Sequence, residues 1–391
     1  MLKQLPIDDL KPGMYVNQVL EQSGSVRIRS KGLVKTQSVI DGLRQKGIVT
    51  VEVDMSRSKI DEPAPAQPVE EKTKPVKTNS ESLNDANDLY MQAVLIQGSF
   101  IENLQSGATR DLKPVSDLSQ SLIDSVFDNQ DALSCLTLIK NTDEYLLEHS
   151  INCSILMGMF AQHLGCDRDS IEQASVGALL MDVGMASLPD EIRFATHTFS
   201  DADWEVMKTH VDIGMEMVEQ CGDISDLVLT IIHQHHERVD GSGYPKGLTG
   251  EDISEFARMA AIVDSYDAMI SHRPHKEAVS PTVALKRLTK QQGLDQNLVK
   301  QFIQCVGVHP VGSLVKLKSG KLGIVSQLGK KDALSPVIMT FYSATSGHFN
   351  EIKRLDLSQV DDEIVSGVRP DDFNINLPKF FRDVFIHQVP G

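Results

Sequence analysis

With 391 residues the chain is too long for one ordinary core, and its 41% apolar content is normal for globular material, so we expect about two to four domains. The formal net charge of −16 repels polyanions, which argues against binding to a nucleic-acid polymer. A small anionic ligand held by a few cations remains compatible with this charge.

The first residues and the lengths of the apolar runs indicate whether the protein is exported or spans a membrane. The start, "MLKQLPIDDLKPGMYV", has no apolar run behind a basic end, and the longest uncharged apolar runs are shorter than the roughly 18 residues of a membrane span. We therefore expect no membrane span and a cytoplasmic protein. The five cysteines are scattered without a CxxC pair, which favours reduced thiols over a disulfide framework.

Residues 1–57 predict a small α+β module. They contain three β-rich runs, "GMYVNQVL", "SVRIRS" and "GIVTVEVD", and a helical run, "TQSVIDGLRQKG", that Gly47 closes. Residues 58–81 follow with four prolines, mixed charges and little to bury, which is typical of a flexible linker.

Helical periodicity begins at Ser82. Apolar residues three and four apart recur through a lead-in, residues 82–140, and a longer segment, residues 141–309, and predict an all-helical bundle. In residues 310–391, β-branched runs alternate with glycines, as in "VHPVGSLVKLKSGKLGIVSQLG", and predict a small β-rich domain. The expected fold class is therefore mainly α, with a small domain at either end of the helical bundle.

The stretch "VGALLMDVGMASLP" places one acid, Asp182, in an otherwise apolar run. An unpaired carboxylate in a core costs several kcal/mol. Either this run is a surface helix whose aspartate is in contact with water, or residues from elsewhere in the chain converge on the carboxylate.

Ten of the twelve histidines lie in the helical segment and its exit. A lone helical histidine is usually an ordinary surface or core residue, but His235 and His236 are followed at once by the loop "DGSGYP". In that loop Gly243 permits close backbone approach, Tyr244 offers a ring for stacking and Pro245 stiffens the exit. Adjacent histidines point about 100° apart on a helix, so both face one metal only at a bend. The alternative is a helix that ends in an ordinary glycine-rich turn.

Four further segments carry ligand-type side chains in or beside apolar helical runs, and these side chains are His149, Asp182, His210 and the pair Asp264 and Asp267. Imidazole and carboxylate together suit iron, manganese or zinc, and a shared aspartate can bridge two ions roughly 3.5–4 Å apart. We therefore predict that Asp182 is buried because metal, rather than water, satisfies its charge.

The segment "HHERVDGSGYP" at residues 235–245 resembles the signature of the HD-GYP family, metal-dependent phosphodiesterases of the HD superfamily that cleave cyclic di-GMP. The resemblance covers about residues 141–309. It includes "VDSYDAMISHRP", which is similar to the family's Asp-rich helix and the Arg-Pro step that follows it. Near the N-terminus, "DDLKPGMYV" resembles the small module often found before HD-GYP domains in bacteria.

This resemblance implies an HD-type helical fold and a site for one or two divalent ions, iron or manganese first and zinc as the alternative. The implied reaction is hydrolysis of cyclic di-GMP, or of a related cyclic dinucleotide, by attack of metal-activated water on phosphorus. A signalling protein that contacts the flanking domains is a further implied partner. A homodimer is an expected assembly.

The resemblance also implies roles for particular residues. The implied metal ligands are His149, Asp182, His210, His235, His236 and Asp264. Asp182, as the bridge between ions, and His210 are also the implied catalytic residues. The implied substrate-binding residues are Gly243, Tyr244, Pro245, Arg238 and Arg273.

The chain departs from the family at the motif that gives the family its name. Where the family has His-Asp-x-Gly-Lys, this chain has Met181 before Asp182 and Met185 at the lysine position. Tyr145 stands where members with three metals have a glutamate. A thioether is a soft ligand that suits copper(I) rather than iron or manganese, so Met181 does not replace the histidine.

The departure divides the ligands unequally between the two ions. One ion keeps four protein ligands: Asp182, His210, His235 and His236. The other keeps only His149, Asp264 and the shared bridge. We therefore expect a weakened phosphodiesterase. The alternative is a catalytically impaired receptor for the nucleotide or a protein-interaction regulator, and a purely scaffolding HD-type domain ranks third.

Overall fold

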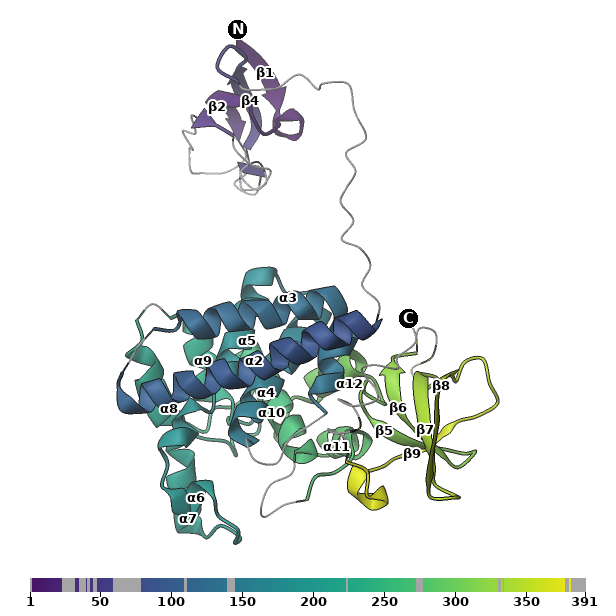
Figure 1. The fold of residues 1–391 in the computed structure, drawn as a ribbon. Helices are drawn as coiled ribbons and strands as arrows, with labels where there is room; N and C mark the ends of the chain where they lie inside the picture. The colour runs from purple at the N-terminus through teal and green to yellow at the C-terminus, as the bar shows by residue number, and fades with distance from the viewer. Residues whose placement is uncertain are drawn as a thin grey trace. The chain divides into compact units, whose positions relative to one another are not determined.

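The computed structural model describes residues 2–22, 32–34, 40, 43–44, 48–58, 79–108, 111–138, 145–222, 224–271, 277–329, 332, 334–376 and 380. The chain divides into two compact units, Met1–Val76 and Lys77–Gly391. Each unit has its own core and is described separately (Figure 1).

The first unit contains a four-stranded antiparallel sheet with strand order β1-β4-β2-β3. The strands are β1 (Leu2–Pro6), β2 (Tyr15–Gln22), β3 (Gly32–Leu33) and β4 (Ile48–Asp54). In β4, Val51 and Val53 are fully buried, with a less buried glutamate between them, as the period-two pattern requires. The sequence gives little signal for β1, because this edge strand has mostly exposed side chains.

The predicted helix of this unit, residues 36–47, lies largely outside the described residues. The predicted strand "SVRIRS" lies wholly outside them. Most of the predicted linker, residues 59–78, lies outside them as well. The division between the two units, at Val76 and Lys77, falls within that linker segment.

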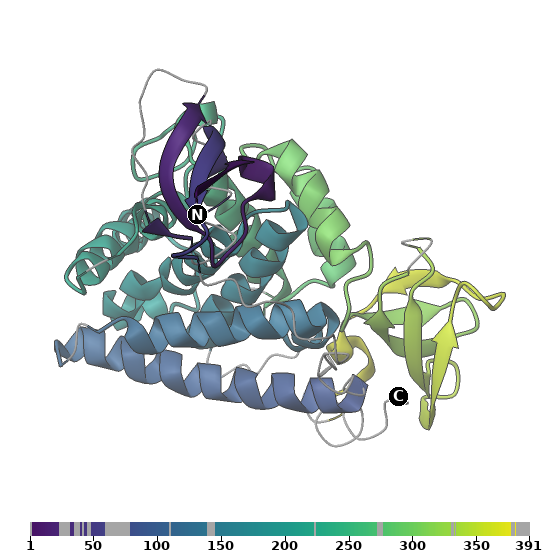
Figure 2. The same cartoon turned by 90° about the horizontal axis from the view of Figure 1, so that it is seen from above.

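The second unit begins with two long helices, α2 (Asn79–Ser106) and α3 (Lys113–Leu136), which pack against each other (Figure 2). The remaining α-helices described are α4 (Tyr145–His163), α5 (Arg168–Leu180), α6 (Asp190–Arg193), α7 (Asp201–Lys208), α8 (His210–Glu219), α9 (Asp226–Gln234), α10 (Glu255–Ile270), α11 (Pro281–Leu288) and α12 (Gln296–Val306). The predicted mainly α, HD-type fold with small sheets at its ends is confirmed.

Helix α4 is the centre of this bundle, because it packs against α2, α3, α5, α10 and α12. Every residue from Glu148 to Ala161 is buried, so the helix is covered on all sides. Gly158 gives α4 its close approach to α3, since a Cβ there would overlap the side chain of Ile123. A polar residue on α4 therefore lies in the interior of the protein.

The chain ends in a five-stranded antiparallel sheet with strand order β8-β7-β6-β5-β9. Its strands are β5 (Leu314–Leu317), β6 (Lys321–Gln327), β7 (Val337–Ser343), β8 (His348–Asp356) and β9 (Ile364–Gly367). The sheet joins the helical core, since β6 contacts α3 and β9 contacts α11. Among the described residues, we find no helix both long and apolar enough to cross a membrane.

Candidate metal centre

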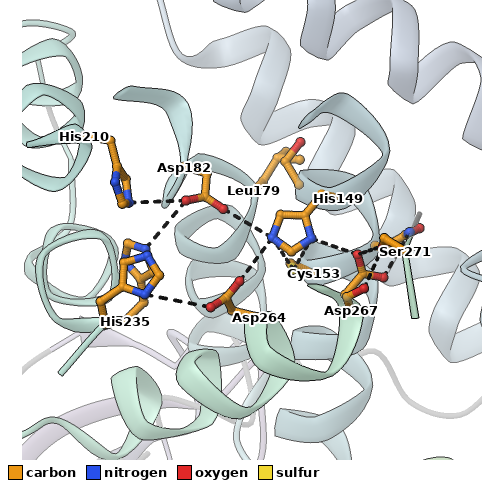
Figure 3. Close-up of polar contacts among 12 residues, drawn as sticks. His149, Cys153, Leu179, Asp182, His210, His235, Asp264, Asp267 and Ser271 are labelled. Carbon is orange, nitrogen blue, oxygen red and sulfur yellow. Dashed lines mark hydrogen bonds and ion pairs between the residues drawn. The ribbon is translucent and has the colours of Figure 1, made fainter. Parts of the chain in front are cut away.

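The six predicted ligands converge at one place in the second unit (Figure 3). Asp182 lies between His210 of α8 and His235, at the end of α9, on one side and His149 of α4 on the other. Asp264, from α10, faces both His149 and His236. Side chains separated by more than one hundred residues therefore meet around two carboxylates.

The position of Asp182 is fixed by the main chain. Helix α5 ends at Leu180, and Asp182 precedes a short 3-10 helix, η2 (Val183–Ser187). A Cβ on Gly184 would overlap the carbonyl oxygen of His210, so only glycine permits η2 to lie this close to α8. This contact holds Asp182 beside the first residue of α8, which is His210.

His210 and His235 are oriented in the same way. Each is in position to donate its Nδ1–H to the main-chain oxygen three residues earlier, at 2.6 Å to Met207 and 2.7 Å to Ile232. The Nε2 atoms then point at Oδ1 of Asp182, at 3.4 Å from His210 and 3.7 Å from His235. Both Nε2 atoms are buried and make no hydrogen bond within the described part of the chain. Two buried lone pairs without hydrogen-bond partners are what a metal ion satisfies.

His236 completes this group from the turn after α9. The helix ends at Gln234, so His235 caps it and His236 is already outside it, which is the bend that the two adjacent histidines require. Nδ1 of His236 lies 3.8 Å from Oδ2 of Asp264. The ring of Tyr244 stacks on that of His236, with 4.7 Å between centroids and 27° between planes.

The loop after His236 is held by a buried carboxylate that the sequence analysis did not single out. Glu237 is 2% exposed, and its two oxygens accept hydrogen bonds from the main-chain N–H groups of Lys246 and Leu248, at 2.7 and 2.9 Å. A Cβ on Gly243 would overlap the main chain at Glu237 and Arg238. The loop is therefore fastened directly to the segment that carries His236.

The imidazole of His149 lies among three carboxylates. Its Nε2 lies 3.3 Å from Oδ2 of Asp182 and 3.2 Å from Oδ1 of Asp264, and its Nδ1 lies 2.8 Å from Oδ2 of Asp267. Asp267 is fully buried and also accepts a hydrogen bond from Asn152, at 3.2 Å. The sequence points to Asp267 as a ligand-type side chain beside Asp264, but its contact with His149 depends on a distant histidine and is seen only in the structure.

The geometry separates two ligand groups that share Asp182. One group has four members, Asp182, His210, His235 and His236, whereas the other has three, His149, Asp182 and Asp264. Met181 is fully buried in the hydrophobic core beside the shared aspartate. The donor set of imidazoles and carboxylates fits a borderline divalent cation, and the four-membered group fits one best.

Charge and burial set the protonation states. Burial by itself raises the pKa of Asp182 and Asp264, but hydrogen bonds and charge attraction from the nearby histidines outweigh it and hold both pKa values below their usual range. Burial lowers the pKa of His210, and burial with repulsion from His235 lowers that of His236 further. Ionised carboxylates beside the neutral imidazoles of His210 and His236 form the protonation state that metal binding requires in the four-membered group.

The predicted substrate-binding residues have different placements. Gly243, Tyr244 and Pro245 lie in the loop that follows His236. Nη1 of Arg238 donates to the main-chain oxygens of His235 and Glu237, at 3.2 and 2.8 Å, so this guanidinium helps to close the same loop. Arg273 lies outside the described residues, within the gap at 272–276. The roles of these residues in substrate binding stay predictions.

Similarity to known proteins extends over most of the chain. Residues 134–298 match the HD domain family, and residues 2–115 match a domain of unknown function, DUF3391. Cyclic di-GMP phosphodiesterase PA4108 of Pseudomonas aeruginosa is 31% identical over 359 residues, which are 88% of this chain and 86% of that protein. The cyclic di-GMP phosphodiesterase response regulator RpfG of Xanthomonas campestris is 37% identical over 141 residues, 36% of this chain and 37% of its own length.

Among solved structures, Bd1817, a HDG"Y"P protein from Bdellovibrio bacteriovorus, superposes with a TM-score of 0.47 at 20% identity, over 78% of this chain and 99% of that one. The helical fold and the histidine–carboxylate cluster define an HD-type domain. The chain belongs to the HD-GYP family, which confirms the family predicted from "HHERVDGSGYP".

Proposed function

We propose that the protein is a metal-dependent hydrolase of cyclic dinucleotides, with cyclic di-GMP as the first substrate to test, and that it acts in the cytoplasm. The observation that carries the proposal is the pair of buried Nε2 atoms, on His210 and His235, that face Asp182 without a hydrogen bond. Two relatives with the same domain are named cyclic di-GMP phosphodiesterases, one of them over 88% of this chain.

In this proposal Asp182, His210, His235 and His236 hold the first ion, and His149 and Asp264 join Asp182 around a weaker second one. Iron or manganese suits the mixed imidazole and carboxylate donors, with zinc as the alternative. A divalent ion in this position supplies Lewis-acid stabilisation of the phosphate and lowers the pKa of a water molecule. Tyr244, stacked on His236, forms the wall against which the substrate lies.

The reaction is tested on the purified full-length protein loaded with manganese or iron(II). Cyclic di-GMP should be converted to its linear product, and a metal count should find the ion in stoichiometric amount. Asp182→Asn should abolish both, whereas Asp212→Asn, on α8 with its side chain 72% exposed, should change neither. A fully metallated protein that yields no linear product would show that the hydrolase assignment is wrong.

A specific observation favours a second function, that of a catalytically impaired receptor. Met181 is fully buried where the family has a metal-binding histidine, so the second group is left with three ligands. In this alternative the nucleotide binds without efficient cleavage, and the bound state is passed on to a signalling partner through the flanking domains. Tight nucleotide binding with slow or absent turnover would select the receptor over the enzyme.

A further inference from the structure

Helix α7 is the least covered α-helix beside the metal centre. None of its residues, from Asp201 to Lys208, is buried, although α8 begins only two residues later with His210. Ser200 and Asp203 form a capping box that fixes its start, with 2.8 Å between the Ser200 main-chain nitrogen and Oδ2 of Asp203. In Figure 1, α6 and α7 extend from the lower edge of the helical bundle. An ordered helix thus presents its side chains to solvent next to the site.

The last residue of α7 brings a cation to the tyrosine of the glycine loop. Nζ of Lys208 lies 5.9 Å from the centroid of the Tyr244 ring, and that ring stacks on His236. The side chain is 38% exposed and is held by Glu205, whose Oε1 lies 2.7 Å from Nζ. The lysine therefore stands one aromatic ring away from the metal-ligating histidines, at the solvent side.

One helical turn before Lys208 lies Trp204, the only tryptophan of the chain. Residues four apart share a helix face, so the indole and the ammonium are neighbours on α7. The indole is 47% exposed, and its ring contacts Phe199 edge-on, with 5.3 Å between centroids and 79° between planes. An edge-on contact orders the indole while leaving ring surface for a flat ligand.

We propose that Trp204 and Lys208 form a nucleobase-binding subsite, in which a purine of the substrate stacks on the indole while the ammonium contacts the adjoining phosphate. This subsite rests on the proposed function, and it names residues of α7 that the metal centre does not include. His236, Tyr244 and Lys208 are linked by ring contacts, and Trp204 lies one helical turn before Lys208 on α7; we call these four residues the stripe. In the proposed function the scissile phosphate lies at the metal centre, where the stripe begins. A base separated from that phosphate by one sugar would lie along this stripe.

The chemistry of the stripe matches a cyclic dinucleotide better than a protein surface. Stacking on an aromatic side chain is the common way in which proteins hold an unpaired base, and a lysine supplies the charge that a phosphodiester needs. The chain as a whole carries a net charge of −16, so a cation beside the site is needed to offset repulsion of an anionic ligand. Docking of another protein on the exposed Trp204 is the alternative that the test must separate.

Because Trp204 is the only tryptophan, intrinsic fluorescence reports on this subsite directly. Full-length protein, both metal-free and loaded with manganese, is mixed with cyclic di-GMP, and tryptophan emission is followed before turnover, while calorimetry measures binding in parallel. We expect emission to be quenched with the same dissociation constant that calorimetry gives. Binding by calorimetry without any change in emission would overturn the subsite.

Substitutions provide the second measurement. Trp204→Ala should weaken cyclic di-GMP binding about tenfold, within the range for loss of base stacking, whereas Trp204→Phe should keep most of the affinity. Lys208→Gln should weaken binding several-fold, with a smaller effect at high salt. Phe127→Ala is the matched control, because Phe127 of α3 is also exposed, at 45%, and also carries a cation, Arg168, at 4.8 Å from its ring.

The two levels of the proposal fail in different ways. If the parent protein neither binds nor cleaves cyclic di-GMP, the proposed function is wrong. If the parent binds but Trp204→Ala and Phe127→Ala bind equally well with unchanged metal content, the subsite alone is wrong. A Trp204→Ala loss that Trp204→Phe restores, with metal content constant throughout, would establish the subsite.

Discussion

The imidazole of His149 is aligned by the carboxylate of Asp267, whose Oδ2 lies 2.8 Å from Nδ1. This contact turns Nε2 of His149 toward Asp182 and Asp264. A carboxylate that accepts the second N–H of a ligating histidine fixes the ring and raises its basicity. Asp267 therefore acts as a positioning residue for the three-membered ligand group.

Replacing Asp267 should weaken only that group. Asp267→Asn should lower affinity for a second ion about 10- to 100-fold, the range for loss of such a supporting contact, and leave the first ion in place. Metal titration followed by calorimetry measures both affinities. Ser271→Ala is a milder control, since it removes the hydroxyl that contacts the main-chain oxygen and Oδ2 of Asp267 and keeps the carboxylate. Equal metal affinities in Asp267→Asn and the parent would contradict the positioning role.

Restoring the family's motif should restore the second ion. Met181→His with Met185→Lys should raise the metal count from one toward two and increase hydrolysis of cyclic di-GMP at least tenfold, equivalent to about 1.4 kcal/mol of transition-state stabilisation. Because Met181 is fully buried, a histidine there without metal costs on the order of 1–3 kcal/mol in stability, so metal must be present during folding.

The control for this restoration is Met181→Leu, which keeps an apolar side chain and should change neither the metal count nor the rate. A double variant that folds and binds two ions, yet cleaves no faster than the parent, would place the catalytic block elsewhere. If the parent already turns over at roughly 1 per second or more, the missing histidine is harmless and the receptor function should be dropped.

The unequal ligand groups predict unequal responses to loss of a histidine. His235→Ala removes one of four ligands from the first group, and alanine supplies no donor in its place. The variant should therefore no longer bind metal in stoichiometric amount. His149→Ala should lower the metal count only where a second ion was bound. Elemental analysis of dialysed protein distinguishes the two results. A His235→Ala variant that retains its ion would show that the first group is wrongly assigned.

The two groups should also differ in their dependence on pH. Burial lowers the pKa of His149, but charge interactions with Cys153 and Tyr145, together with hydrogen bonds to Asp182 and Asp264, more than offset this and raise it well above its usual value. His149 is therefore protonated near neutral pH, and an ion in its group must displace a proton, so affinity there rises with pH. His210 and His236, with lowered pKa values, are already neutral, so affinity at the first group should change little.

Calorimetry in two buffers of different ionisation enthalpy measures this difference as about one proton released with the second ion and almost none with the first. In metal-free protein the effect of pH is opposite, because the contribution of His149 to stability falls as pH rises. A raised pKa means that protonated His149 stabilises the fold fully below about pH 6.5, and this stabilisation is lost as pH rises through the folded-state pKa. Proton release with the first ion as large as with the second would contradict these protonation states.

How far the sequence predicts the site depends on whether a signal is local. His235 and His236 were predictable because a glycine loop follows them directly, and Asp182 because an acid in an apolar run needs a partner. Asp267 stands out as a ligand-type residue, but its role in orienting His149 is not predictable, since that histidine is 118 positions away in the chain. Arg238 is predicted to bind substrate, a role that stays a prediction, and its Nη1 also donates to main-chain oxygens of its own loop, a contact that residue type alone does not reveal.

The strands and helices show the same limit. Apolar periodicity predicted the bundle and the β-rich end of the chain, because burial on one face leaves a repeating pattern. It gave little signal for β1, whose side chains are mostly exposed, and it gave no role to α7, where no residue is buried. A helix without a buried residue carries little pattern from the core, so its position beside Tyr244 becomes visible only in three dimensions.

The close approach of Gly184 to α8 has a consequence for how this site can change over evolutionary time. The distance between Asp182 and His210 is set by two stretches of main chain in contact, not by the side chains at positions 181 and 185. Substitutions at those two positions change the side chains beside the carboxylate of Asp182 and leave the main-chain contact that positions this carboxylate in place. The residues at positions 181 and 185 can therefore change one side chain at a time without moving Asp182 relative to His210.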